Sequence, residues 1–215
     1  MNEGIRFDLT YEKMPWDMVD AVVFDIGNVL IRFAPDDFIE QLFPGDKKKQ
    51  QDMLERVYNG RYWPLFDLGT MTYEEAAKRL CEEFGGEEKD YLHALYGWIE
   101  LKTPIEEGWR AAKKCRAMGK KLYLLSNYPQ AGYERLRVKF EDHFADLFDG
   151  GFISCYEHRM KPDAAVYETL AARCGFDISR AVFIDDTLKN VEGAMKTGMH
   201  GFHMHESGMM DRFFL

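Results

Sequence analysis

The sequence of 215 residues has no long hydrophobic run, and its longest unbroken apolar stretches are as short as Ala21–Phe24 and Ala181–Ile184. A helix that crosses a membrane needs about 20 consecutive, mostly apolar residues, so we expect neither a transmembrane helix nor a membrane partner. The start of the chain, from Met1 to Gly4, lacks the apolar stretch of a signal peptide, which favours a cytoplasmic protein over an exported one.

The sequence also has fewer basic residues than acidic ones. The chain has 28 Lys and Arg residues against 37 Asp and Glu residues, which gives a formal net charge of −9. Because nucleic-acid backbones attract basic surfaces, we expect no nucleic-acid partner. The 4 cysteines are widely spaced and include no Cys-x-x-Cys pair. This pattern favours reduced packing residues over a disulfide framework.

The composition, with 46% hydrophobic and 30% charged residues, is typical of a folded protein and argues against disorder. Short apolar runs, which predict buried strands, alternate along the chain with helical patterns. This alternation predicts an α/β fold with a mainly parallel sheet. The expected strands cover Val19–Phe24, Lys121–Leu125, Gly151–Ser154, Ala181–Ile184 and the less apolar run His200–Met204.

Capping patterns mark the ends of three predicted helices. The helices run over 72–84 with Thr72 and Glu75 as a capping box, from Thr103-Pro104-Ile105-Glu106 to Gly119, and from near Asp163 to Gly175. In the second helix, Thr103 is the expected N-cap and Glu106 the partner that closes the capping box.

The segment from 34 to 101 departs from the alternation, because it contains helical patterns and no strand run. We interpret it as an all-helical cap inserted after the first strand, above the edge of the sheet where open α/β folds bind ligands. The predicted domains are therefore an α/β core, residues 1–33 and 102–215, and a helical cap, residues 34–101. Several cap aromatics are expected to pack between cap and core or to shape a substrate pocket, namely Tyr62, Trp63, Phe66, Tyr96 and Trp98.

Polar side chains follow four of the predicted strands, directly or after a short loop. Each of these patterns also occurs in ordinary turns and helix caps, so none is informative alone. Because parallel strands end at one edge of a sheet, we expect the four sets to meet there. Together they supply a carboxylate, a hydroxyl and amide pair, a cation and an acid pair that suits a divalent metal. The residues are Asp25, Ser126 with Asn127, Lys161, and Asp185 with Asp186 followed by Asn190.

These four motifs, in this order, resemble those of the haloacid dehalogenase superfamily of hydrolases. The matching stretches are Asp25-Ile26-Gly27-Asn28-Val29, Ser126-Asn127, Lys161-Pro162 and Asp185-Asp186, and the cap residues 66–75 also resemble the middle of such caps. The resemblance covers nearly the whole chain from Val19 onward. It implies a Rossmann-like α/β core with an inserted helical cap.

The resemblance also implies an Mg²⁺-dependent phosphatase that acts on a small phosphorylated metabolite. Asp25 would attack phosphorus and form an aspartyl-phosphate, which water then hydrolyses. The metal would be held by Asp25, the backbone carbonyl of Gly27, Asp186 and, directly or through water, Asp185. Lys161 would offset charge on the transferring oxygens, and Ser126 with the backbone of Asn127 would hydrogen-bond them.

One position departs from the pattern of the family. Phosphatases of this family usually carry a second Asp two residues after the nucleophile, where it serves as general acid and base, and this chain has Gly27 there. The backbone carbonyl for the metal is retained, but the proton donor is missing. His158 and Glu157, in the loop before Lys161, are the replacements that the sequence offers.

The missing acid leaves several functions open. The Gly-Asn-Val form resembles a bacterial subgroup that includes sugar-1-phosphate phosphatases, notably for α-glucose 1-phosphate, and this is the function that we favour. A haloacid dehalogenase would need no metal but carries an aromatic residue at the position of Gly27. A non-catalytic binding protein would have no reason to retain Asp25, Lys161 and Asp186, and a phosphomutase is a further possibility. We expect a monomer or a homodimer.

Overall fold

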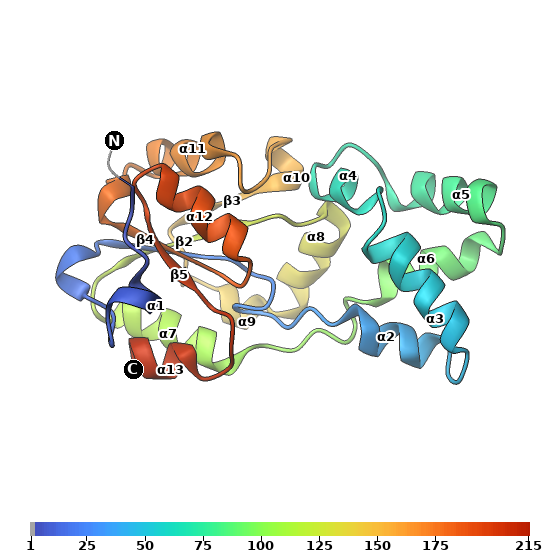
Figure 1. The fold of residues 1–215 in the computed structure, drawn as a ribbon, viewed down its shortest axis with the longest axis horizontal. Coiled ribbons are helices and arrows are strands. Elements are labelled where there is room, and N and C mark those ends of the chain that lie inside the picture. The colour runs from blue at the N-terminus through green and yellow to red at the C-terminus, as the bar shows by residue number, and fades with distance from the viewer. Residues whose placement is uncertain (1–2) are drawn as a thin grey trace.

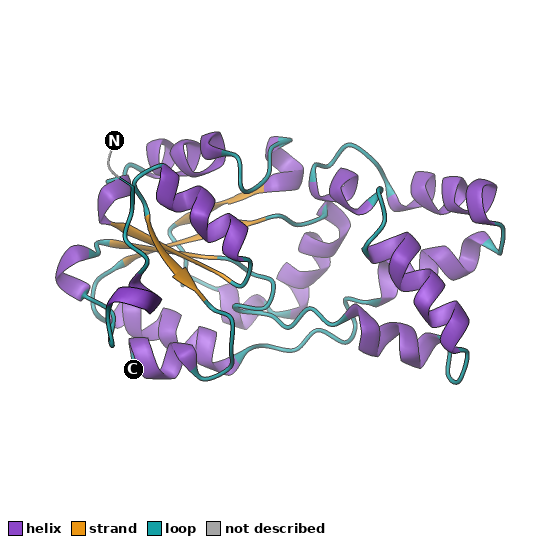
Figure 2. Cartoon of the chain, in the orientation of Figure 1, coloured by secondary structure: helices purple, strands orange, loops and turns teal. Residues whose placement is uncertain are grey.

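The computed structural model describes residues 3–215 and contains one five-stranded parallel sheet with the strand order β3-β2-β1-β4-β5 (Figures 1 and 2). This confirms the predicted α/β fold with a mainly parallel sheet. The strands are β1 (Ala21–Phe24), β2 (Lys121–Ser126), β3 (Gly150–Ile153), β4 (Ala181–Asp185) and β5 (His200–His203).

Helices precede, separate and follow the strands. The α-helices are α1 (Phe7–Thr10), α2 (Pro35–Leu42), α3 (Lys47–Met53), α4 (Trp63–Asp67), α5 (Tyr73–Phe84), α6 (Glu88–Gly97), α7 (Glu106–Ala117), α8 (Gln130–Lys139), α9 (Glu141–Phe144), α10 (Ser154–Glu157), α11 (Ala164–Cys174), α12 (Leu188–Lys196) and α13 (Met209–Phe214). The shorter turns are the 3₁₀ helices η1 (Trp16–Met18) and η3 (Ile178–Arg180) and the π-helix η2 (Leu54–Tyr58). Among residues 3–215, no helix combines the length and the apolar character that a bilayer-spanning segment needs.

Both faces of the sheet are buried, which explains why its strands read as continuous apolar runs. Alternate residues of β1 point to opposite faces, so Val22 and Phe24 join one apolar cluster and Ala21 and Val23 join another. Figure 1 shows α7 and α13 on the first face and α11 and α12 on the second. The first cluster continues into the helices of residues 34–101, so cap and core share one apolar interior.

The structure corrects some of the predicted boundaries. Ser154 begins α10 instead of ending β3, and its side chain is then free to bridge two loops. The helix predicted from Thr103 begins only at Glu106, and its N-cap residue is Ile105, whose side chain makes no capping hydrogen bond. The reason is that the backbone before this helix is extended and pairs with the segment after β1, where Ile105 N donates to Leu30 O at 2.8 Å.

The elements between β1 and α7 are all helical. They form a group that lies beyond α8 and α10, past the end of the sheet and not on either of its faces (Figure 1). We call residues 34–101 the cap segment. Its capping box is confirmed, because Thr72 Oγ1 accepts from Glu75 N while Thr72 N donates to the Glu75 carboxylate. The predicted helix that ends at Gly175 is also confirmed, as α11 with Gly175 in the left-handed conformation.

Candidate active site

Strand register brings the predicted site residues to one edge of the sheet. Phe24, the last residue of β1, pairs with Leu124 of β2 and with Ile184 of β4. Asp25 therefore lies level with Asp185, and Ser126 lies one residue further along its strand. All three of these polar side chains are buried or nearly so. The carboxyl ends of three neighbouring strands thus form a single polar site, as in other open α/β folds.

Lys161 is the cation of this site. Its Nζ lies 3.0 Å from Asp25 Oδ1 and 2.6 Å from Asp185 Oδ2, and it donates to Leu125 O at 3.1 Å. Burial alone would lower the pKa of Lys161, but the Asp185 and Asp25 carboxylates outweigh burial and raise this pKa above its ordinary value. The buried amine is therefore a fixed positive charge beside Asp25.

Three carboxylates meet at this edge and fit a hard divalent cation. Asp25, Asp185 and Asp186 each offer an oxygen, and these oxygens lie within 4.8 Å of one another. Asp186 Oδ2 accepts from the side chain of Asn28 at 2.9 Å, which fixes its direction. The Asp185 carboxylate has more hydrogen-bond donors around it, because Lys161, Asn190 and Thr187 N all donate to its two oxygens.

The side chain of Asn127 joins two loops of the site. Its amide donates to Lys161 O at 3.1 Å and accepts from Lys161 N at 2.8 Å, so the loop after β2 holds the loop that carries the lysine. The backbone of Tyr128 is also engaged, since its N–H donates to Ser154 Oγ at 2.9 Å. Ser126 lines the cavity beside these residues.

Gly27 stands at the position where the resemblance predicts an acid, and backbone strain does not require a glycine there. Its φ lies outside the positive range that favours glycine, and a Cβ built there would meet no atom of residues 3–215 within 4 Å. The neighbouring Asn28 has the unusual backbone instead, with φ of +51°. The loop therefore has room for a side chain at position 27.

A cavity of about 190 Å³ lies between this edge and the cap segment. Core and cap both contribute to it, and the cap side is mostly aromatic. Two ionisable residues in its wall, Asp67 and Lys102, were not predicted from the sequence as site residues. The lining residues are Asp25, Gly27, Asn28, Phe33, Trp63, Asp67, Trp98, Lys102, Ser126, Asn127, Tyr128, Pro129, Asp186 and Thr187.

Several polar atoms of this wall are buried without a partner among residues 3–215. They are Asp67 Oδ1, Lys102 Nζ and the Tyr128 hydroxyl. Burial raises the pKa of Asp67 to about 7 and lowers the pKa of Lys102 to about 7. Unsatisfied buried polar groups are costly, so these atoms of the cavity wall are suited to bind water or a polar ligand.

The proton donors that the sequence suggested lie elsewhere. The Glu157 carboxylate forms a two-point ion pair with Arg173, at 2.6 and 2.8 Å, and the His158 ring is hydrogen-bonded to Leu68 O at 2.8 Å. Neither residue lines the 190 Å³ cavity. Proximity in sequence to Lys161 was misleading, because the turn at 154–158 directs these side chains toward α11 and the loop after α4.

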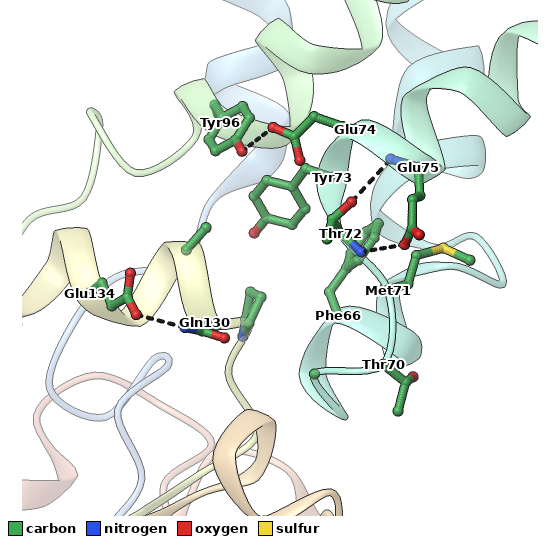
Figure 3. Close-up of a pocket in the computed structure, with 13 residues that line it drawn as sticks. Phe66, Thr70, Met71, Thr72, Tyr73, Glu74, Glu75, Tyr96, Gln130 and Glu134 are labelled. Carbon is green, nitrogen blue, oxygen red and sulfur yellow. Dashed lines mark hydrogen bonds between the residues drawn. The ribbon is translucent and has the colours of Figure 1, made fainter.

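A second cavity, of about 370 Å³, lies between α5 of the cap segment and α8 of the core (Figure 3). Its wall includes Glu74, hydrogen-bonded to Tyr96, and Glu134, hydrogen-bonded to Gln130. None of the motif residues contributes to it. We therefore place the chemistry in the smaller cavity, which meets the larger one at Pro129.

Comparisons with known proteins are consistent with this geometry. Over 188 residues, the chain is 26% identical to the sesquiterpene phosphatase AstK of Aspergillus oryzae, which covers 87% of this chain and 90% of the relative. A HAD family enzyme of Bacteroides thetaiotaomicron, solved with magnesium and inorganic phosphate, has a similar fold, with a TM-score of 0.67 and 18% identity over 89% of this chain and 98% of that one.

The L-2-haloacid dehalogenase of Xanthobacter autotrophicus also has this fold, with a TM-score of 0.62 and 18% identity over 86% of this chain and 77% of that one. A family model of haloacid dehalogenase-like hydrolases matches residues 19–198, which include all four motifs. The chain therefore belongs to the haloacid dehalogenase-like hydrolase family.

Proposed function

We propose that the protein is an Mg²⁺-dependent phosphatase that hydrolyses a small phosphorylated metabolite through an aspartyl-phosphate on Asp25. The observation that carries the proposal is the meeting of three carboxylates within 4.8 Å, with the Lys161 amine 3.0 Å from Asp25. Halide displacement needs no metal ion, whereas carboxylate oxygens this close together suit a hard divalent cation. The site therefore fits phosphoryl transfer better than halide displacement.

The donor set suits magnesium, since Asp25, Asp186 and the carbonyl of Gly27 offer oxygen ligands at one edge. Bound there, Mg²⁺ would offset the negative charge of the transferring phosphoryl group. Asp185 has the different role of orienting Lys161, because donors already occupy both of its oxygens. Asn28 keeps Asp186 directed at the site.

Residues of the chain supply the nucleophile, bind the phosphoryl group and position the lysine in the proposed reaction. Asp25 supplies the attacking oxygen, and its Oδ1 also accepts from Ile26 N at 2.7 Å, which fixes the carboxylate. Lys161 and Ser126 bind the phosphoryl oxygens, and the cap segment supplies part of the cavity wall around the substrate. Asn127 positions Lys161 through the two hydrogen bonds between their loops.

We propose a sugar phosphate, such as a sugar 1-phosphate, as the substrate. The cavity of about 190 Å³ is smaller than the roughly 300–1,000 Å³ of typical drug-sized sites, which favours a compact substrate. Its aromatic walls offer flat faces to a sugar ring, and Lys102 offers a substrate oxygen an amine that has no hydrogen-bond partner among residues 3–215. An isoprenoid phosphate, suggested by the name of AstK, would have to extend into the neighbouring cavity of about 370 Å³.

A phosphate-release screen with the purified protein and Mg²⁺ tests the proposal. Sugar 1-phosphates, sugar 6-phosphates, nucleotides, phosphoamino acids and sesquiterpenyl phosphates form the panel, and 2-haloacids are assayed in parallel for halide release. We expect phosphate release that is highest with a sugar phosphate and absent from an Asp25→Asn variant. Halide release without phosphate release would overturn the proposal.

A further inference from the structure

The proposed phosphatase needs a proton donor that its nucleophile loop does not provide. The leaving oxygen of an alkyl phosphate departs slowly unless an acid protonates it, and proton transfer of this kind contributes about 10²–10⁴-fold. Gly27 stands at the position of the usual acid. The proton must then come from another element that reaches the same cavity.

The carboxylic acids in the wall of the 190 Å³ cavity are Asp25, Asp67 and Asp186. Asp25 is the nucleophile of the proposed reaction, and Asp186 lies in the metal-binding cluster and accepts from Asn28. Asp67 belongs to neither group, and its Oδ1 is buried without a hydrogen-bond partner among residues 3–215. It is the carboxyl group of this wall that remains available to a substrate oxygen.

The backbone of Asp67 is fixed against the core. Ser154 Oγ donates to Asp67 O at 2.5 Å and accepts from Tyr128 N at 2.9 Å, so one hydroxyl ties the end of α4 to the loop after β2. Gly69, with φ of +65°, approaches so closely that a Cβ there would lie 2.1 Å from Cys155 O. Figure 1 shows α4 beside α10 at this contact.

We propose that Asp67 is the general acid and base of this active site, supplied by the cap segment in place of the missing acid at Gly27. The inference rests on the proposed phosphatase function. In the first step an Asp25 oxygen bonds to phosphorus, the bond from phosphorus to the leaving oxygen breaks with its electron pair, and this oxygen takes the proton from Asp67. The alcohol then leaves, and Asp67 remains as a carboxylate.

In the second step the Asp67 carboxylate takes a proton from a water molecule while the water oxygen bonds to phosphorus. The bond between phosphorus and the Asp25 oxygen breaks, and its electron pair restores the Asp25 carboxylate. Inorganic phosphate leaves, and Asp67 is protonated again for the next turnover. The cycle consumes one phosphate ester and one water and needs no other reactant.

The electrostatics support this role, because a general acid works best with a pKa near the working pH. Burial raises the pKa of Asp67 to about 7; Lys161 opposes the rise, and Asp25 adds to it. The titratable groups around Asp67 on the neighbouring elements are Asp25, Tyr73, Lys102, Tyr128, Cys155, Lys161 and Asp186. Among them, the Tyr73, Tyr128 and Cys155 side chains have raised pKa values and stay neutral near pH 7.

The test compares wild type with Asp67→Asn on phosphate esters of graded leaving-group pKa, with Asp67→Glu as the conservative rescue. We expect Asp67→Asn to lower kcat/KM about 100-fold or more for alkyl phosphates and little for aryl phosphates, whose leaving groups need no proton. With an aryl phosphate, the variant should release a burst of phenol and accumulate phosphoenzyme, because the base for the second step is missing. The fall of kcat/KM above about pH 7 should disappear in the variant.

Glu157→Gln and His158→Gln serve as matched controls, because both residues lie in the adjacent turn but outside the cavity. The inference would be overturned if kcat/KM of Asp67→Asn depended on leaving-group pKa no more steeply than kcat/KM of wild type. It would also be overturned if this dependence became steeper in Lys102→Met and stayed unchanged in Asp67→Asn. Failure of the phosphatase proposal looks different, because wild type itself would then release no phosphate from any ester. A purely structural role would lower activity equally for alkyl and aryl esters and produce no burst.

Discussion

The Nζ of Lys161 lies 3.0 Å from the Oδ1 of Asp25, and both residues are almost fully buried. In the proposed mechanism, a buried amine at this distance holds the attacking carboxylate in place through its Oδ1. It also offsets part of the negative charge at an edge of the sheet where Asp25, Asp185 and Asp186 lie together. In the proposed phosphatase, catalysis and stability would therefore both depend on this one amine.

Replacement of the nucleophile should separate activity from folding. Asp25→Asn is nearly isosteric and retains a group that can accept from Ile26 N, so we expect the fold to persist and phosphate release to disappear. Phosphate assays and a thermal melt check the two parts. Phosphate release at the wild-type rate, or a phosphoenzyme that maps to another residue, would contradict the assignment of Asp25.

Removal of the lysine should cost stability as well as activity. Lys161→Met leaves the buried carboxylates of Asp25 and Asp185 without their cation, and removal of one partner from a buried ion pair typically costs about 3–5 kcal/mol. Denaturant unfolding measures this loss. Lys189→Met, on the exposed surface of α12, is the matched control and should leave both stability and activity unchanged.

Metal dependence can be measured without a known substrate. Mg²⁺ should raise the melting temperature, because a ligand that binds only the folded state stabilises it by about 2.7 kcal/mol at 100 times its Kd. EDTA should reverse this shift and abolish phosphate release. Asp186→Asn should lose the Mg²⁺-induced shift; a variant that keeps the whole shift would exclude Asp186 as a ligand.

A carboxyl group placed on the nucleophile loop should compensate for the loss of Asp67. Position 27 has space for a Cβ, so Gly27→Asp can be built without backbone strain. In an Asp67→Asn background, we expect Gly27→Asp to recover at least about 10-fold in kcat/KM for alkyl phosphates. Gly27→Ala is the control that adds a side chain without an acid, and recovery by this variant would refute proton donation as the cause.

The raised pKa of Asp67 also predicts how stability depends on pH. Burial raises this pKa from its ordinary value to about 7 in the folded state, so the folded protein binds more protons than the unfolded chain between about pH 4 and pH 7. Stability from this group is therefore lost as the pH rises through that range.

Asp67→Asn removes this penalty, so its melting temperature relative to wild type should be higher at pH 8 than at pH 5. For a chain of this size, about 1 kcal/mol corresponds to roughly 2–4 °C, which thermal melts resolve. A difference that is constant across this pH range would show that the Asp67 carboxyl does not titrate with a raised pKa in the folded protein.

The sequence by itself determined the sheet and the polar residues at its edge. Buried parallel strands read as continuous apolar runs, and their carboxyl ends must lie together, so Asp25, Ser126 and Asp185 were placed correctly from chain order alone. The capping box at Thr72 was equally local, because its two hydrogen bonds join residues three apart.

Only the tertiary structure decided which further ionisable residues line the cavity beside Asp25. Asp67 and Lys102 show no periodicity or spacing that marks them in the sequence. Asp67 reaches the cavity because the cap segment contacts the core through Ser154 and Gly69, and Lys102 lines the same cavity from the core residue that follows the cap segment. The same packing removes water from both side chains and brings the pKa of each to about 7. Burial of an ionisable group depends on contacts between distant segments, and for this reason local sequence patterns did not reveal it.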